Sequence, residues 1–95
     1  MSIIVDLSLF PIGKEESLSR YASRAVKIIK ESGLAYQIGP MGTAIEGEWD
    51  EVMGVVKRCM EDLRKDCRLI YMTMKVDCRE GDTGRIPKKV KAVGG

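Results

Sequence analysis

One fifteen-residue segment, 36–50 with the sequence YQIGPMGTAIEGEWD, constrains the fold more than any other part of the chain. Gly39, Pro40 and Gly42 separate two short extended stretches, because proline fixes φ and glycine admits the positive φ that a tight reversal can need. The two stretches are therefore predicted to pair as a β-hairpin. Acidic residues follow within 48–51, where the free N–H groups of a helix N-terminus favour negative charge. A strand pair thus leads directly into a helix.

The spacing of apolar residues predicts the remaining elements. Alternation over 3–10 predicts a half-buried strand, and a three-and-four spacing over 18–29 predicts a helix that Gly33 ends. A second helix is predicted over 48–65, and clean alternation over 69–78 predicts a last strand with one core face. The order strand, helix, strand, strand, helix, strand indicates an α+β, ferredoxin-like two-layer sandwich. Its antiparallel four-stranded sheet would carry both helices on one face.

Length and composition indicate a single globular domain. The chain has 95 residues, of which 44% are hydrophobic and 32% charged, so we expect one domain over 1–95. The segment 79–95 is a basic C-terminal tail that could form a short helix. We expect it to be solvated, and an anion-binding tail is the alternative. The net charge of +2 is too small to indicate nucleic acid. We expect no membrane association and a cytoplasmic location, because no apolar run is long enough to span a bilayer and no basic region precedes the first apolar residues.

The inventory of reactive side chains favours binding over catalysis. Histidine is absent, and the cysteines Cys59, Cys67 and Cys78 form no CxxC pair, which argues against a zinc site and against histidine-dependent nucleophilic catalysis. Cys59 falls on the apolar stripe of the second helix and is interpreted as a buried hydrophobe. We therefore predict no catalytic residue, no metal and no cofactor. An enzyme using Asp6 and Asp77 as a carboxylate pair is a lesser alternative.

Polar and aromatic side chains gather on the sheet face that the two helices leave uncovered. The first and last strands should be neighbours in the sheet, and they would place on this face Asp6, Ser8, Phe10, Tyr71, Thr73, Lys75 and Asp77. The hairpin would add either Thr43 and Ile45 or Ala44 and Glu46, because the sequence leaves its register open.

This face allows two interpretations. It can be an ordinary solvated surface with a cross-strand pair such as Asp6 with Lys75, worth at most about 1 kcal/mol. Alternatively, a second subunit covers it in part, which suits the mixture of aromatic and polar groups and the exposed edge strands. The second interpretation predicts a homodimer or homotetramer, joined through sheet faces and edges, with a small-molecule cavity at the interface.

Several short segments of the chain together form a distinctive pattern: SGL at 32–34, YQ at 36–37, PMGT at 40–43, IEGEWDEVM at 45–53, FPIG at 10–13, KVD at 75–77 and KVKAV at 89–93. This pattern resembles that of the UPF0045 (DUF77) family of small thiamine-binding proteins. The resemblance spans nearly the whole chain. It implies a ferredoxin-like fold, dimers or tetramers joined through the sheets, and binding of thiamine or its hydroxymethylpyrimidine part without an established catalytic activity.

Thiamine presents a thiazolium cation and an aminopyrimidine, so carboxylates, hydroxyls and aromatic rings are the groups expected to meet it. The leading candidates are Ser8, Thr43 and Glu46, followed by Asp6, Phe10, Tyr36, Tyr71, Thr73 and Asp77. Thr43 and Glu46 are an odd number of residues apart, so a regular strand cannot point both at the same face. Either a β-bulge turns both side chains to the same face, or one of the two residues does not belong to the site.

Two other functions remain open at this stage. The chain could be a structural or regulatory homo-oligomeric module without a small-molecule ligand. It could also bind nucleic acid through the sheet and the basic tail, although the central strands lack the clustered aromatics on which RNA bases stack. We therefore favour a non-catalytic binding protein.

Overall fold

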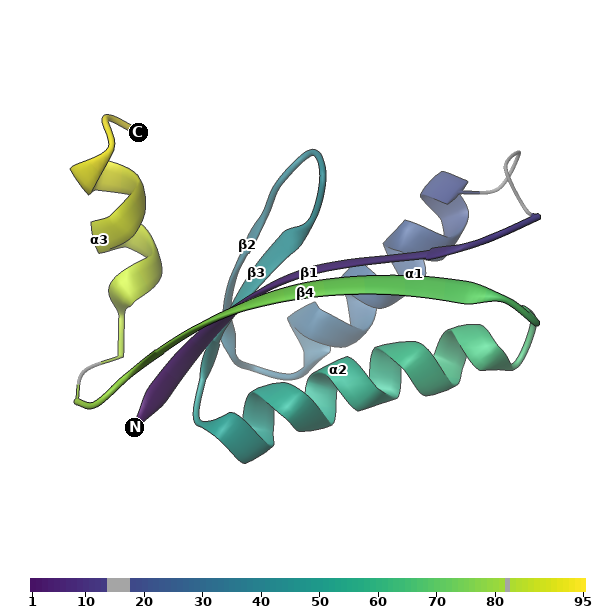
Figure 1. Cartoon of the computed structure of the whole chain (residues 1–95), viewed down its shortest axis with the longest axis horizontal. Coiled ribbons are helices and arrows are strands. Elements are labelled where there is room, and N and C mark those ends of the chain that lie inside the picture. Colours follow the sequence, from purple (N-terminus) through teal and green to yellow (C-terminus); the bar gives the residue numbers. More distant parts are fainter. Residues whose placement is uncertain (14–17, 82) are drawn as a thin grey trace.

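The structure is a computed structural model that describes residues 1–13, 18–81 and 83–95. Its elements, in chain order, are β1 (Ser2–Pro11), α1 (Leu18–Glu31), β2 (Ala35–Ile38), β3 (Thr43–Gly47), α2 (Trp49–Arg64), β4 (Ile70–Arg79) and α3 (Arg85–Ala92). The four strands form one antiparallel sheet in the order β2-β3-β1-β4. Since α1 and α2 cover one face of this sheet, the predicted ferredoxin-like α+β fold is confirmed (Figure 1).

The core lies between this sheet face and the two helices. Ile3, Val5 and Ile45 point into it from β1 and β3 and are fully buried. The helices contribute Ala25 and Ile29 of α1, together with Val52, Val55, Val56 and Cys59 of α2. The apolar periodicity that predicted the helices therefore also marks the side chains that hold them to the sheet.

The hairpin turn uses its glycines differently from the prediction. Neither Gly39 nor Gly42 has a positive φ, although Gly33, which ends α1, does. The Gly39 N–H donates to the Gly42 carbonyl at 2.8 Å. A Cβ on Gly42 would lie 2.9 Å from the Leu7 carbonyl oxygen and 3.1 Å from Asp6 Oδ1. Glycine is thus needed at 42 for close approach to β1 rather than for its backbone freedom.

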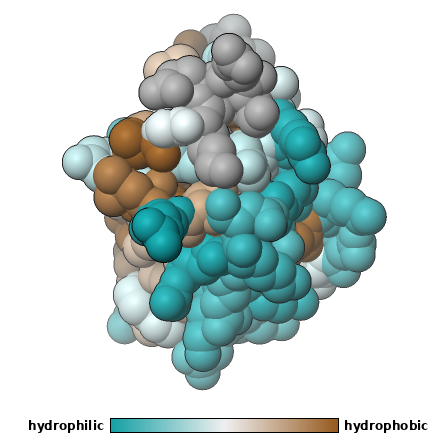
Figure 2. Space-filling model, turned by 90° about the vertical axis from the view of Figure 1, so that its right-hand side faces the viewer, coloured by the Kyte–Doolittle hydropathy of each residue, from teal (hydrophilic) through white to brown (hydrophobic). Residues whose placement is uncertain are grey.

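The predicted core face of β4 is largely exposed, so that part of the prediction is wrong. Met72, Met74 and Val76 are 38–39% exposed, because α1 and α2 pack over the inner strands and leave the outermost strand uncovered. Figure 2 views the molecule end-on and shows apolar side chains gathered on one flank, while most of the visible surface is hydrophilic. The fold therefore leaves β4 with an open edge and an apolar side.

The basic C-terminal segment is more ordered than a solvated tail. Its helix, α3, packs against the sheet face opposite α1 and α2 and stands apart from that pair (Figure 1). Arg85 and Ile86 at its start are each 7% exposed. Across the described ranges, none of the helices combines the length and apolar character needed to cross a membrane.

The burial of Cys59 leads to a prediction about thiol reactivity. Its Sγ lies 3.7 Å from the Ala25 carbonyl oxygen, and burial raises the pKa of the thiol to about 11. Because the thiolate is the reactive form, Cys59 should resist a maleimide at pH 7 in the native protein and react readily in denaturant. Mass spectrometry of the labelled peptides would identify the modified residue. Native labelling of Cys59 as fast as in denaturant would contradict the described core.

Candidate functional site

The pairing of β1 with β4 brings several predicted residues together on the sheet face opposite α1 and α2, here called the open face. Asp6 lies opposite Lys75, Ser8 opposite Thr73, and Phe10 opposite Tyr71. The Phe10 and Tyr71 rings are 6.0 Å apart between centroids and are tilted by 51°. The edge of this face therefore carries an aromatic pair next to two hydroxyl groups.

The pairing of β1 with β3 resolves the two alternatives for the hairpin. Ile4 lies opposite Glu46 and Asp6 opposite Ala44, so Ala44 and Glu46 face the open side. Thr43 therefore points with Ile45 toward the helices. The pairing runs without interruption from 43 to 47, so no bulge brings Thr43 and Glu46 to one face.

Tyr36 also lies away from the open face. It pairs with Ile45, and paired residues share a face of the sheet, so Tyr36 is on the helix side of β2. Gln37, which pairs with Ala44, takes the corresponding place on the open face. The structure thus places Thr43 and Tyr36 on the sheet face opposite to that of the other predicted site residues, although Thr43 lines a hollow near the hairpin turn together with Ser8 and Phe10.

Glu46 attaches α3 to the sheet. Its carboxylate accepts the Arg85 N–H at 3.0 and 2.9 Å, one distance to each oxygen, and the Ile86 N–H at 3.2 Å. Pro87, the third residue of α3, has no N–H to satisfy. The side chain of Glu46 is only 1% exposed, and these backbone groups, with the positive end of the helix dipole, stabilise its charge.

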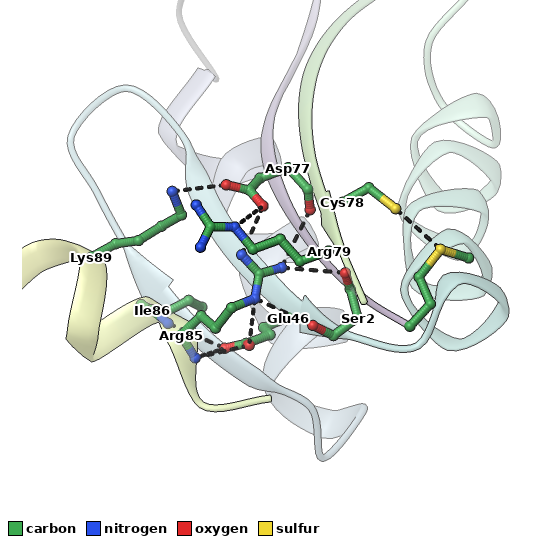
Figure 3. A network of polar contacts seen from close by, with 9 residues as sticks. Ser2, Glu46, Asp77, Cys78, Arg79, Arg85, Ile86 and Lys89 are labelled. Atoms are coloured by element: carbon green, nitrogen blue, oxygen red, sulfur yellow. Dashed lines mark hydrogen bonds and ion pairs between the residues drawn. The ribbon is translucent and has the colours of Figure 1, made fainter. Parts of the chain in front are cut away.

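The Arg85 side chain completes this attachment from the other side (Figure 3). Its Nη1 donates to Asp77 Oδ1 at 2.7 Å, Nη2 to the Ser2 carbonyl at 3.2 Å, and Nε to Ser2 Oγ at 3.3 Å. The guanidinium, whose side chain is 9% exposed, also lies 4.0 Å from Glu46 Oε2. We call the set Ser2, Glu46, Asp77, Arg85 and Lys89 the α3 anchor.

Asp77 is the acid of the α3 anchor that bonds both Arg85 and Lys89. Its carboxylate bonds Lys89 Nζ at 2.7 Å as well as the Arg85 guanidinium. These contacts lower the pKa of Asp77 to about 2, and the hydrogen bond from Lys89 has the largest effect. Asp77 therefore stays ionised and holds α3 at the end of β4.

A cavity of about 300 Å³ lies between the open face and α3. Its lining, which defines the α3 cavity, consists of Ile4, Asp6, Gln37, Ile38, Gly39, Gly42, Ala44, Ile86, Lys89 and Val90. The walls are mainly aliphatic, and the Asp6 carboxylate, the Gln37 amide and the Lys89 ammonium are its polar side-chain groups. Small-molecule sites generally combine apolar walls with a few polar groups in this way.

Asp6 is the one predicted site residue that lines this cavity. Ser8, Phe10, Tyr71 and Thr73 share its sheet face, farther along β1 and β4. Sequence reasoning missed Gln37 and the contribution of α3, whose Ile86 and Val90 form an apolar pair four residues apart. That spacing, just after Gly84, was the available sequence signal for a packed helix.

Within the part of the chain that the structure describes, no cluster of three or more cysteine and carboxylate side chains could hold a metal ion.

The α3 anchor predicts a specific pH dependence of stability. A carboxyl whose pKa is lower in the folded state binds protons more readily when unfolded, so its stabilising effect is present above pH 4 and disappears as the pH falls through 2. The difference in unfolding free energy between wild type and Asp77→Asn should therefore be constant above about pH 5 and shrink below pH 4. Urea titrations at several pH values would measure it. A difference that does not change down to pH 2 would contradict this role of Asp77.

Comparison with known proteins supplies the family. A family model described as thiamine-binding protein matches residues 5–94. A UPF0045 protein of Mycobacterium bovis is 36% identical over 94 residues, covering 98% of this chain and 92% of the relative.

Two solved structures share the fold over nearly their full length. A hypothetical protein from Methanocaldococcus jannaschii superposes with a TM-score of 0.87 at 29% identity, covering 98% of this chain and 96% of that one. A Thermotoga maritima protein, provisionally assigned to thiamine biosynthesis or salvage, gives 0.86 at 26% identity, covering 98% and 99%. Together with the match over 5–94, these similarities show that the chain belongs to the thiamine-binding protein family, UPF0045.

Proposed function

We propose that this protein binds thiamine or its hydroxymethylpyrimidine part in the α3 cavity, without catalysis, as a homo-oligomer. The observation that supports this most is a single carboxylate, Asp6, among the aliphatic walls of a cavity of about 300 Å³. The family is named for binding thiamine rather than for a reaction.

The cavity suits the chemistry of this ligand. Asp6 can accept a hydrogen bond from the pyrimidine amino group or balance the thiazolium charge, and the Gln37 amide can donate to a ring nitrogen. Ile4 and Ile86 are both buried and offer flat apolar contact to a ring. Gly42 contributes by its small size, since a Cβ there would crowd Asp6 Oδ1 at 3.1 Å.

In this proposal Glu46 acts on the ligand indirectly. Its carboxylate is occupied by the N–H groups of Arg85 and Ile86, so it holds α3 as the wall of the cavity instead of contacting the ligand. Ser8, Phe10, Tyr71 and Thr73 lie where a second subunit would border the open face.

The outer strand supports the homo-oligomer. Among the described residues, β4 is an edge strand, and no strand pairs with the backbone N–H and C=O groups on its outer side. Met72, Met74 and Val76 leave its helix side apolar. A second copy of β4, running antiparallel, would pair with that edge and cover the apolar side with its own. Such a contact is two-fold symmetric and closes on itself.

Calorimetric titration tests the ligand and its position. Wild type should give saturable heat with thiamine or hydroxymethylpyrimidine and none with AMP. Asp6→Asn should weaken thiamine binding by about ten- to a hundredfold, since a hydrogen bond to a charged group contributes roughly 1.5–3 kcal/mol.

Asp50→Asn is the matched control, because Asp50 is an exposed aspartate in the first turn of α2, away from the cavity. Its affinity for thiamine should equal that of wild type. Equal weakening by both variants, or none by Asp6→Asn, would refute the placement at Asp6.

Light scattering with size-exclusion chromatography tests the oligomer. Met74→Glu would bury charge in the proposed β4 contact and should convert the oligomer to monomer. Met41→Glu, at a methionine that is 85% exposed in the hairpin turn, is the control and should leave the assembly unchanged. A Met74→Glu protein with the mass of wild type would exclude β4 as the contact.

The exposed apolar side of β4 also supports a second candidate function, a homo-oligomeric assembly module without a small-molecule ligand. A stable oligomer that binds neither thiamine nor hydroxymethylpyrimidine would favour this candidate.

A further inference from the structure

A second cavity lies beside α3, where the chain leaves β4. It measures about 560 Å³ and is lined by Arg79, Glu80, Arg85, Lys88, Lys89, Ala92 and Val93, which define the basic cavity. Four of these side chains are cationic and one is anionic. One of the cations, Arg85, is buried and fixed by the α3 anchor, so the cavity has a rigid charged wall.

The acids of the α3 anchor neutralise the cations of the basic cavity only in part. The Asp77 carboxylate faces three cations: Arg85 Nη1 and Lys89 Nζ at 2.7 Å each, and Arg79 Nε at 3.8 Å. The Glu46 carboxylate, besides accepting the N–H groups of α3, lies 4.0 Å from the Arg85 guanidinium. Asp77 and Glu46 together therefore face three cations, and they leave one positive charge at the exposed heads of Arg79 and Lys89 unbalanced.

Lys88 and Glu80 are the other two charged side chains that line the basic cavity. Both are exposed and carry opposite charges. Because the charge of Glu80 opposes the binding of an anion, its removal should strengthen such binding. Removing the charge of Lys88 should therefore weaken anion binding in this cavity, and removing the charge of Glu80 should strengthen it.

We propose that the basic cavity binds the phosphate group of a phosphorylated ligand, so that a thiamine phosphate ester is preferred over free thiamine. This inference rests on the proposed function. Arginine forks and lysine ammonium groups are the side chains that bind phosphate oxygens most strongly. The cavity presents both kinds, on α3 and on the end of β4.

Lys89 connects the two cavities, since it lines both. A ring held at Asp6 and a phosphate held at Lys88 and Arg79 would lie on either side of Lys89. The groups of the protein then match those of the ligand: the Asp6 carboxylate meets the aminopyrimidine, and lysine and arginine meet the phosphate on the hydroxyethyl chain of the thiazolium. Free thiamine has no group for the basic cavity.

Calorimetric titrations of the full-length protein with thiamine, thiamine monophosphate and inorganic pyrophosphate test this inference. The monophosphate should bind at least about tenfold more tightly than thiamine at low salt, and its advantage should shrink at 0.5 M NaCl. Lys88→Gln should reduce the advantage about threefold to tenfold, and Glu80→Gln should increase it. Both variants should bind thiamine as wild type does.

Lys91→Gln is the matched control, because Lys91 is an exposed lysine on α3 that does not line the basic cavity. It should leave both affinities unchanged. If thiamine binds but the monophosphate binds no more tightly, the phosphate site is refuted and the proposed function stands. Equal losses in Lys88→Gln and Lys91→Gln would likewise refute a defined site. If neither thiamine nor its ester binds, both proposals fail, even if pyrophosphate alone binds.

Discussion

The contact between the buried Glu46 carboxylate and the start of α3 is the interaction on which the candidate site depends. Two backbone N–H groups and the Arg85 guanidinium surround a carboxylate that is only 1% exposed. A buried charge is tolerated only when its hydrogen-bonding capacity is met. The same contact satisfies the free N–H groups at the start of the helix. Each side therefore depends on the other, and the α3 cavity exists because this contact is made.

The two sheet faces have different tasks as a result. The face toward α1 and α2 supplies the stability through Ile3, Val5 and Ile45. The open face carries polar groups, and α3 covers one end of it. The helix is held there by charge and hydrogen bonds at Glu46 and Arg85 and by the buried side chain of Ile86. The edge strand β4 borders both faces and is available for a second subunit.

The sequence was sufficient for the fold and for the composition of much of the open face. Alternation in β1 and β4 predicted which side chains share the open face, and Asp6 indeed lies opposite Lys75. The hairpin register could not be predicted, because either face of Thr43–Glu46 could pack against helices. Glu46 was predicted to contact the ligand, but the groups that its carboxylate binds lie 39 and 40 residues away, at the start of α3. The spacing of Ile86 and Val90 indicates a packed helix but not the part of the sheet against which it packs. The apolar side of β4 was predicted to belong to the core. The sequence shows which residues are apolar, but it does not show how far the helices extend over the sheet.

The central claim is that the ligand binds between the open face and α3. Hydrogen exchange with and without thiamine tests this claim most directly. The account predicts slower exchange of the amides of Lys88 to Val90 in α3 and of Asp6 in β1 when thiamine is present, since the ligand would hold α3 against the sheet. Protection confined to the opposite side, around Leu18 to Ala25 of α1, would contradict it.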